Sequence, residues 1–361
     1  MAFSILALNP GSTSTKVARY EDDVLLWQDT LRHTPEELAP FGSVIGQFEF
    51  RKKMVLDALR EHDGDAVTLH AVVGRGGIID PIPGGTYRVD PNLVERLKLG
   101  KPWEHASNLG GVLAYALAEP RSIPAFIVDP VSVDEMLPEA KVMGLPGLSK
   151  PSFLHALNVK ATVRLAARDL ERPWDSLNCV VVHLGGGISV VAHRKGRAVD
   201  VNSANECGPF SLERAGGLPA GSLARLCFSG RYSEPDMIRR LNGGAGMKAY
   251  LGTTDMREVR RRIDEGDEKA SLIYRTMVWQ ISKEIGAQAV AMGEPVDAIL
   301  FTGGIAYDSD FVRLIQERVQ WIAPCLVYPG EDEMSALTQG ALRVLRGEEE
   351  AKNYAENVLS S

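Results

Sequence analysis

The chain has few cysteines, no long apolar run and no excess of basic residues. Its four cysteines form no Cys-x-x-Cys pair, which argues against a zinc-thiolate site and indicates a reducing compartment. No apolar stretch approaches membrane-spanning length, and the run 3–8 is too short for a signal peptide. The net charge of −7 argues against non-specific nucleic-acid binding. We therefore expect a cytoplasmic protein with neither nucleic acid nor membrane as partner.

The segment 5–20 carries a turn that suits a phosphate chain. A short apolar strand at 5–8 runs into Asn9-Pro10-Gly11-Ser12-Thr13-Ser14-Thr15-Lys16, which offers amide, hydroxyl and ammonium donors. The common phosphate loop has a second glycine before its lysine and then a helix. Here Thr15 precedes Lys16, and alternating residues continue toward a second turn. The pattern predicts a β-hairpin that holds phosphates, and the alternative is an ordinary polar hairpin turn.

The same layout occurs a second time. A strand at 180–184 runs into Gly185-Gly186-Gly187, then a strand at 188–192, a turn and a strand at 197–201. Three glycines without Cβ atoms let a backbone approach a ligand closely. Two such units indicate two structurally related halves, and 361 residues exceed what one core usually serves. A boundary in the Gly- and Pro-rich stretch 144–151 predicts domains 1–148 and 149–346, with a polar tail at 347–361.

Helices and strands alternate along the chain, which indicates an α/β fold. We expect strands at 66–73, 125–128 and 298–301. Expected helices span 43–62, 91–99, 107–118 (with Ser107 as N-cap), 153–170, 273–292, 310–322 and 334–345.

Polar clusters follow five of these strands, where ligands gather in open α/β sheets. They are 9–16, Gly74-Arg75-Gly76-Gly77, Asp129, 183–187 and Thr302-Gly303-Gly304. If all five share one sheet edge, they form a nucleotide site. Arg75 suits a carboxylate or phosphate, or it makes a structural ion pair. The alternative for Asp129 is a structural role as the cap of a turn or helix. The alternative for His183 is a core histidine that is hydrogen-bonded to the backbone.

A long polar loop at 202–217 follows the second glycine turn. Arg214 is its only positive charge, and it either reaches that turn or is solvated.

These motifs together resemble the sugar-kinase, actin and heat-shock-ATPase superfamily. Within it the chain is similar to the carboxylate kinases and, among these, to the butyrate kinases. The resemblance covers essentially the whole chain. It rests on 9–16, 73–77 (VGRGG), 128–130 (VDP), 183–187 (HLGGG), 213–217 (ERAGG), 301–304 (FTGG) and 329–333 (PGEDE).

The resemblance implies two actin-like (ribonuclease H-like) domains, each a mixed sheet with flanking helices, with a nucleotide cleft between them. It implies Mg²⁺ as cofactor, a homodimer or higher homo-oligomer, and reversible transfer of a phosphoryl group from ATP to a short-chain carboxylate. The products with butyrate are butyryl phosphate and ADP.

The resemblance also implies roles for individual residues. Arg75 and Arg214 would bind the substrate and the transferred group, assisted by Asp129, and Pro209 would line the substrate site. Glu333, or less favourably Glu331, would lie on the metal side. The nucleotide-binding set is Asn9, Gly11, Ser12, Ser14, Lys16, His183, Gly185, Gly186, Gly187, Gly303, Gly304 and Ile305.

Departures from the acetate kinases favour the butyrate kinases. Acetate kinases carry a histidine where this chain has Gly74 and an asparagine where it has Gly186. They also carry a Phe-His-Gly-Thr-Ser-His segment whose histidines have no counterpart at 145–150. An acetate, propionate or branched-chain acid kinase remains an alternative. More remote alternatives are a sugar kinase, with Asp129 as base, and a heat-shock-type ATPase.

Overall fold

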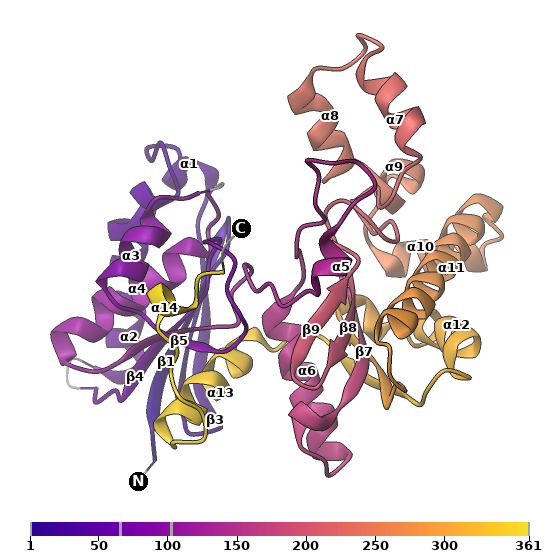
Figure 1. Ribbon diagram of the computed structural model, residues 1–361. Coiled ribbons are helices and arrows are strands. Elements are labelled where there is room, and N and C mark those ends of the chain that lie inside the picture. The colour runs from indigo at the N-terminus through magenta and orange to yellow at the C-terminus, as the bar shows by residue number, and fades with distance from the viewer. Residues whose placement is uncertain (1, 65–66, 102–103, 360–361) are drawn as a thin grey trace. The chain divides into compact units, whose positions relative to one another are not determined.

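The computed structural model describes residues 2–64, 67–101 and 104–359, which form two compact units. Unit 1 contains the described residues up to Asp134 together with those from Asp332 onward, and unit 2 spans Glu135–Glu331. Figure 1 shows the return of the chain to unit 1 as the yellow C-terminal segment beside indigo strands. No helix in the described part of the chain is long and apolar enough to cross a bilayer.

This division differs from the expected domains 1–148, 149–346 and 347–361. The chain enters unit 2 before the Gly- and Pro-rich stretch, and it leaves unit 2 before its last long helix, α13 (Glu333–Leu345). The expected tail also belongs to unit 1, because the backbone of Lys352 bonds to both Thr86 and Arg88. Tyr354 is buried in the core of the same unit, so the tail is an integral part of that unit.

Unit 1 contains one mixed sheet in the order β3-β2-β1-β4-β6-β5. Strands β1, β4 and β6 are parallel, whereas β2, β3 and β5 run antiparallel to their neighbours. The strands are β1 (Ser4–Pro10), β2 (Ser14–Glu21), β3 (Val24–Arg32), β4 (Ala71–Arg75), β5 (Thr86–Arg88) and β6 (Ala125–Val128). The other helices are α1 (Pro35–Leu38), α2 (Phe48–Asp63), α3 (Pro91–Lys98), α4 (Asn108–Ala118) and α14 (Tyr354–Asn357), with 3-10 turns at Ile45–Gln47 and Glu119–Arg121.

Side chains alternate between the two faces of this sheet, as strand geometry requires. Leu6, Leu8 and Val17 point to one face and pack with apolar residues of α2, α3 and α4 in a single core. Helix α13 contacts β1, β2, β4 and β6. It is drawn on the opposite side of the sheet from those three helices in Figure 1. The face that carries Asn9 and Lys16 is therefore the one left for α13.

Unit 2 contains a second mixed sheet in the order β11-β10-β7-β8-β9. Its strands are β7 (Asn178–Leu184), β8 (Ile188–Arg194), β9 (Arg197–Val201), β10 (Ala298–Gly303) and β11 (Cys325–Pro329), of which β7, β10 and β11 are parallel. Its helices are α5 (Pro138–Lys141), α6 (Ala156–Asp169), α7 (Ala220–Cys227), α8 (Glu234–Leu241), α9 (Gly246–Leu251), α10 (Met256–Asp264), α11 (Glu268–Ala291) and α12 (Ser309–Val319), with 3-10 turns at Trp174–Ser176 and Gly304–Tyr307.

Helix α11 packs on β7, β8 and β9, and its apolar residues share one core with Val180, Val182 and Leu184. Helix α6 contacts β7 and β10. Both predicted strand–turn–strand–turn–strand units are confirmed, as is the fold class of mixed sheets with flanking helices.

Several sequence-based expectations need correction. The five polar clusters do not share one edge, because 9–16, 74–77 and Asp129 belong to the first sheet and the other two to the second. Ser107 occupies the N-cap of α4 but bonds to His105 instead of a helix amide. The strand expected at 66–73 begins at Ala71, and its expected first residue lies outside the described residues.

Candidate active site

The β1–β2 turn in unit 1 presents polar groups on a hairpin. Asn9 and Lys16 are paired across the antiparallel ladder, so their side chains project from the same face. The Gly11 amide donates to the Ser14 carbonyl at 2.7 Å and closes the turn. Ser12 and Lys16 are exposed, and Ser14 is half-buried. The turn therefore offers hydroxyl and ammonium donors to a ligand, without a helix N-terminus.

Arg75 lies at the end of β4 and forms an ion pair with Glu333, the first residue of α13. The Asn9 amide donates to the other oxygen of the same carboxylate at 2.6 Å. The side chain of Arg75 is 25 % exposed and that of Glu333 is 15 % exposed, so the ion pair is partly buried but reachable from solvent. Arg75, predicted for the substrate, and Asn9, predicted for the nucleotide, thus both contact the carboxylate of Glu333, which was predicted for the metal.

Asp129 directly follows β6, whose Val128 pairs with Arg75 in the parallel ladder. Its carboxylate accepts a hydrogen bond from the Gly85 amide at 2.7 Å, and its own amide donates to the Gly85 carbonyl. Asp129 has φ +38°, which is uncommon for a non-glycine residue. The carboxylate therefore fixes the neighbouring loop, and its assistance to Arg75 and Arg214 remains a prediction.

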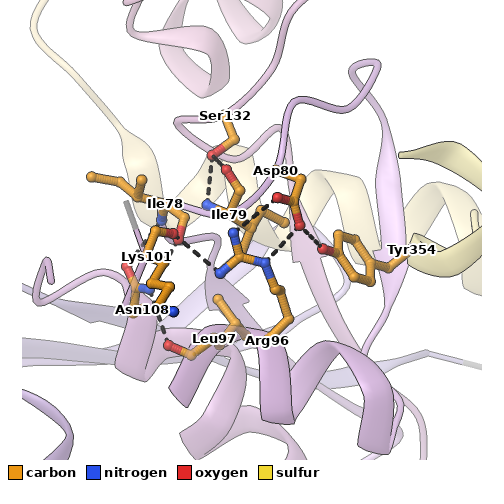
Figure 2. A network of polar contacts seen from close by, with 9 residues as sticks. All are labelled: Ile78, Ile79, Asp80, Arg96, Leu97, Lys101, Asn108, Ser132 and Tyr354. Carbon is orange, nitrogen blue, oxygen red and sulfur yellow. Dashed lines mark hydrogen bonds and ion pairs between the residues drawn. The ribbon is translucent and has the colours of Figure 1, made fainter. Parts of the chain in front are cut away.

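The loop that follows Arg75 is held by a network of charged and phenolic groups (Figure 2). Asp80 accepts from the Arg96 guanidinium at 2.6 and 2.9 Å, and also from the Tyr354 hydroxyl. The bonds from Arg96, despite partial burial, lower the pKa of Asp80 to about 2. Burial, with the nearby Asp80 carboxylate, raises the pKa of Tyr354 to about 12. The C-terminal segment thereby anchors the loop that begins at Arg75.

Two further side chains fix this loop (Figure 2). Asn108 accepts from the Ile78 amide at 2.9 Å and donates to the Ile78 carbonyl at 3.0 Å. The Ser132 hydroxyl makes the equivalent pair of bonds with the backbone of Ile79, at 2.8 and 3.0 Å. Each of these residues replaces a missing strand partner, so the backbone groups of Ile78 and Ile79 are hydrogen-bonded although the loop has no regular structure.

His105 lies close enough to Arg75 for its titration to be affected. Burial lowers the pKa of His105, and the positive charge of Arg75 lowers it further. The imidazole is therefore neutral at pH 7, and its Nδ1 lies 2.7 Å from the Ser107 hydroxyl. His105 was not predicted as a site residue, because the sequence around it contains no motif that indicates its proximity to Arg75.

In unit 2, His183 lies at the end of β7 and is 1 % exposed. Its Nδ1 is 2.8 Å from the Asn158 side-chain oxygen, and its Nε2 is 3.2 Å from Glu331. The ring of His155 stacks on it with centroids 3.8 Å apart. Glu331 thus belongs to the His183 cluster and Glu333 to the Arg75 cluster, so the two metal-side candidates lie in different units.

Arg214 lies against the triple-glycine turn. A Cβ atom on Gly187 would be 2.2 Å from the Arg214 Nη1, so only glycine permits this contact. The Arg214 guanidinium also donates to the Ala204 carbonyl at 3.2 Å. Burial lowers the pKa of Arg214, but it remains protonated at pH 7. The predicted Pro209 is buried in the same loop.

A cavity of about 1020 Å³ lies within unit 2. Among the predicted nucleotide residues, Gly185, Gly186, Gly304 and Ile305 line it, whereas His183, Gly187 and Gly303 do not. The volume lies at the upper end of the range for small-molecule sites. The cavity is thus large enough for a nucleoside beside two glycine-rich turns.

Other lining residues were missed from the sequence. Several come from α10, from the 3-10 turn after β10 and from the residues next to these two elements. They include Asp255, Arg257, Arg260, Arg261, Tyr307 and Asp308. Helix α10 contains four arginines, at 257, 260, 261 and 262, and such a charged segment is equally typical of a solvated helix. Only the folded chain connects this helix with the glycine turns.

The described residues contain no group of three or more His, Cys, Asp or Glu side chains arranged to hold a metal ion. Mg²⁺ at phosphate sites keeps several waters and uses one or two carboxylates. A single Glu333, bonded to Asn9 at the β1–β2 turn, fits that requirement for an ion that arrives with a nucleotide.

Residues 154–322, slightly less than half of the chain and all within unit 2, match the model of the acetokinase family. The chain is also similar in structure to the acetate kinase of Porphyromonas gingivalis, with a TM-score of 0.79 and 20% identity, covering 95% of this chain and 100% of that one.

Two further structures are similar over almost their whole length. The propionate kinase of Francisella tularensis subsp. tularensis has a TM-score of 0.75 and 18% identity, with 94% of this chain and 98% of that one covered. The acetate kinase of Entamoeba histolytica has a TM-score of 0.76 and 15% identity, with 94% and 99% covered. The chain therefore has the two-domain, actin-like fold of the acetate kinases.

Proposed function

We propose that this protein transfers the γ-phosphoryl group of ATP to a short-chain carboxylate, with butyrate as the preferred acceptor, and that it catalyses the reverse reaction. The observation that carries the proposal is the pair of β-hairpin turns, each associated with an arginine. Arg75 shares a carboxylate with Asn9 of the first turn, and Arg214 lies on Gly187 of the second. The match of 154–322 to the acetokinase family supports the same chemistry.

The reaction needs charge neutralisation more than proton transfer. A substrate carboxylate is already ionised at neutral pH, so its oxygen can form the new P–O bond without a general base. The bond between the γ-phosphorus and the β,γ-bridging oxygen breaks, and the products are an acyl phosphate and ADP. Phosphoryl transfer of this kind depends on positioning and on positive groups around the transferred oxygens.

Arg75 and Arg214 are proposed to supply those positive groups. A guanidinium fork matches two oxygens of a carboxylate or phosphoryl group and stays charged. The fork of Arg75 is held by Glu333, so it must exchange this carboxylate for the oxygens of the substrate. Glu333, and less favourably Glu331, would hold Mg²⁺, which when bound neutralises charge on the phosphates.

The cavity of unit 2 is the proposed adenosine site, because Gly304 and Ile305 line it together with Gly185 and Gly186. Asn9, Ser12, Ser14 and Lys16 of unit 1 are proposed to serve the β- and γ-phosphates. We also propose that the protein acts in the cytoplasm as a homo-oligomer, as the resemblance to carboxylate kinases implies.

Butyrate is preferred in this proposal because of the departures from the acetate-kinase pattern. A Cβ atom on Gly74 would lie 2.1 Å from the carbonyl oxygen of Gly110 in α4. The histidine that acetate kinases carry there would force α4 away from β4, so this strand–helix contact is built differently here. Acetate and propionate remain alternative acceptors, since two of the matched structures are named acetate kinases and one a propionate kinase.

The test is an acyl-hydroxamate assay with Mg·ATP, hydroxylamine and a panel of acetate, propionate, butyrate, isobutyrate and glycerol. We expect hydroxamate with butyrate well above that with acetate. Because a single methylene contributes about 1–3 kcal/mol of discrimination, propionate and isobutyrate should react as well. Preference for acetate would move the assignment to the acetate kinases. ADP release with glycerol, without any hydroxamate, would contradict the proposal.

A further inference from the structure

The largest fully buried side chain of the described residues is that of Arg51, which has no role in the proposed mechanism. Arg51 lies on α2, directly beneath the β1–β2 turn, and is 0 % exposed. Buried charges are normally paired with an opposite charge, because desolvation strongly disfavours an isolated ion. The groups around Arg51 must therefore stabilise its buried charge.

The guanidinium binds the backbone of the phosphate turn. Its Nη1 donates to the carbonyl oxygens of Gly11 at 2.9 Å and Ser14 at 3.1 Å, and its Nη2 donates to that of Ser12 at 3.2 Å. Three carbonyls of the turn are thereby drawn toward the interior. Within the part of the chain that the structure describes, the amides of Ser12 and Thr13 donate to no protein group, and both residues are exposed.

The remaining partners of Arg51 are neutral. Gln47 accepts from Nε at 3.0 Å and from Nη2 at 2.8 Å, and the Thr15 hydroxyl lies 2.9 Å from Nη1. The Thr15 hydroxyl also lies 2.9 Å from His33. Burial lowers the pKa of His33 to about 4, assisted by the charge of Arg51, so this imidazole is uncharged at pH 7.

No carboxylate in the described part of the chain pairs with this charge. Among the described residues none forms an ion pair with Arg51, and burial alone accounts for the lowering of its pKa to about 10. The guanidinium is therefore still protonated at pH 7, and its charge lies in a poorly screened interior behind the turn. A group that brings several negative charges to the turn would be attracted by it.

We propose that Arg51 is a positioning residue for the phosphates of the nucleotide, which it favours in two ways. It draws the turn carbonyls inward, so that the amides of Ser12 and Thr13 face outward for phosphate oxygens, and its uncompensated charge attracts the polyphosphate. The proposal rests on the proposed function only in taking ATP as the ligand of this turn.

Gln47→Glu separates the two contributions. The replacement is isosteric, so both hydrogen bonds to Arg51 can persist, but the new carboxylate neutralises the buried charge. Gln28→Glu is the matched control, because it adds the same charge at an exposed position of the same sheet. The probes are a non-hydrolysable imido analogue of Mg·ATP and adenosine, which has no phosphates. Binding to the full chain is measured by calorimetry without any carboxylate.

We expect Gln47→Glu to weaken binding of the imido analogue about tenfold or more, with an unchanged or higher melting temperature and adenosine affinity within twofold of wild type. Gln28→Glu should leave all three quantities unchanged. A purely structural Arg51 predicts normal binding of the analogue by Gln47→Glu, and that result would overturn the proposal. An equal loss of analogue and adenosine binding would overturn it as well.

Arg51→Lys and Arg51→Met provide a second test. Lysine keeps the charge but loses the fork, so Arg51→Lys should bind the analogue more tightly than Arg51→Met. Equal affinities of the two folded variants would contradict the electrostatic part. These binding measurements need no carboxylate acceptor, whereas failure of the proposed function would show as absence of acyl phosphate. The two failures are therefore distinguishable.

Discussion

The two hairpin turns proposed for phosphates are built in opposite ways. In unit 1 the turn contains hydroxyl side chains, and its carbonyls are bound from beneath by the buried Arg51. In unit 2 the turn has no side chains, and Arg214 occupies the space that a Cβ on Gly187 would need. One turn is shaped by a side chain beneath it and the other by the absence of side chains.

This difference implies that the two turns are sensitive to different kinds of substitution. The unit 1 turn should be sensitive to loss or neutralisation of a charge, whereas the unit 2 turn should be sensitive to added atoms. A positive group close to each turn is the feature that they share, and it is the feature that phosphoryl transfer requires.

The largest effect is expected when the arginine of unit 2 is removed. Arg214→Ala should lower kcat roughly 10³-fold or more, judging from arginines that stabilise transferred phosphoryl groups elsewhere. Stability should change little, since the guanidinium donates to a backbone carbonyl, that of Ala204, at the long distance of 3.2 Å and is only half-buried. The measurement is kcat in the hydroxamate assay, with circular dichroism to show that the variant is folded. Near-normal turnover by the folded variant would remove Arg214 from the mechanism.

A smaller effect is expected from one added methyl group in the same turn. Gly187→Ala places a Cβ 2.2 Å from Arg214 Nη1 and should displace the guanidinium, lowering kcat by about 10- to 100-fold. Gly286→Ala in α11 of the same unit is the control, because a Cβ there would have no neighbour within 4 Å and the residue lies outside the proposed site. Equal kcat values for the two variants would show that the clearance at Gly187 has no role.

Stability in acid should fall because each unit contains a buried neutral histidine. Burial lowers the pKa of His33 in unit 1 to about 4 and that of His193 in unit 2 to about 3, against about 6.5 for an unfolded chain. The unfolded state therefore binds more protons below pH 6.5. Both contributions to stability are complete above pH 6.5 and are lost as the pH falls, that of His33 by about pH 4 and that of His193 by about pH 3.

Each histidine should remove up to about 1.4 kcal/mol of unfolding free energy per pH unit in that window. Urea unfolding at pH 7, 6 and 5 measures the slope, and His193→Gln should reduce it. A free energy of unfolding that is constant over this range would contradict the assignment of neutral buried imidazoles.

The smallest effect is expected at the loop after Arg75. Tyr354→Phe removes the hydrogen bond to Asp80 but leaves Arg96 in place, so about 1 kcal/mol should be lost. The KM for the carboxylate should rise two- to fivefold while kcat stays near wild type. Tyr328→Phe is the control, because it removes an equivalent bond to Asp169 at 2.9 Å in unit 2. The same KM change in both variants would contradict a specific role of Tyr354.

The sequence carried enough information for the two hairpin units and for most of the helices around them. Both turns have local signals, glycine and hydroxyl residues in the first and three glycines in the second, and these signals act within a few residues. Helix α2 begins five residues later than expected, at Phe48, because a 3-10 turn at Ile45–Gln47 precedes it. The short helices α7 to α10 were not predicted, whereas α3, which is similarly short, was.

Long-range contacts were beyond the reach of the sequence. Glu333 was proposed for the metal, but its pairing with Arg75 joins residues far apart in the chain. Arg51 has no motif, because its role depends on a turn about 40 residues earlier folding over it. The return of Tyr354 to the first unit likewise follows from burial in a core that no local pattern specifies.

The most direct test of the account is the reverse reaction followed by ³¹P nuclear magnetic resonance. Butyryl phosphate and Mg·ADP are mixed with wild type, Arg75→Ala and Arg214→Ala, each shown to be folded. The account predicts that wild type converts the acyl phosphate to ATP and that each variant does so roughly 10³-fold more slowly, because the proposed mechanism assigns both arginines to the transferred group. ATP formation at the wild-type rate by either variant, or release of inorganic phosphate without ATP by wild type, would contradict it.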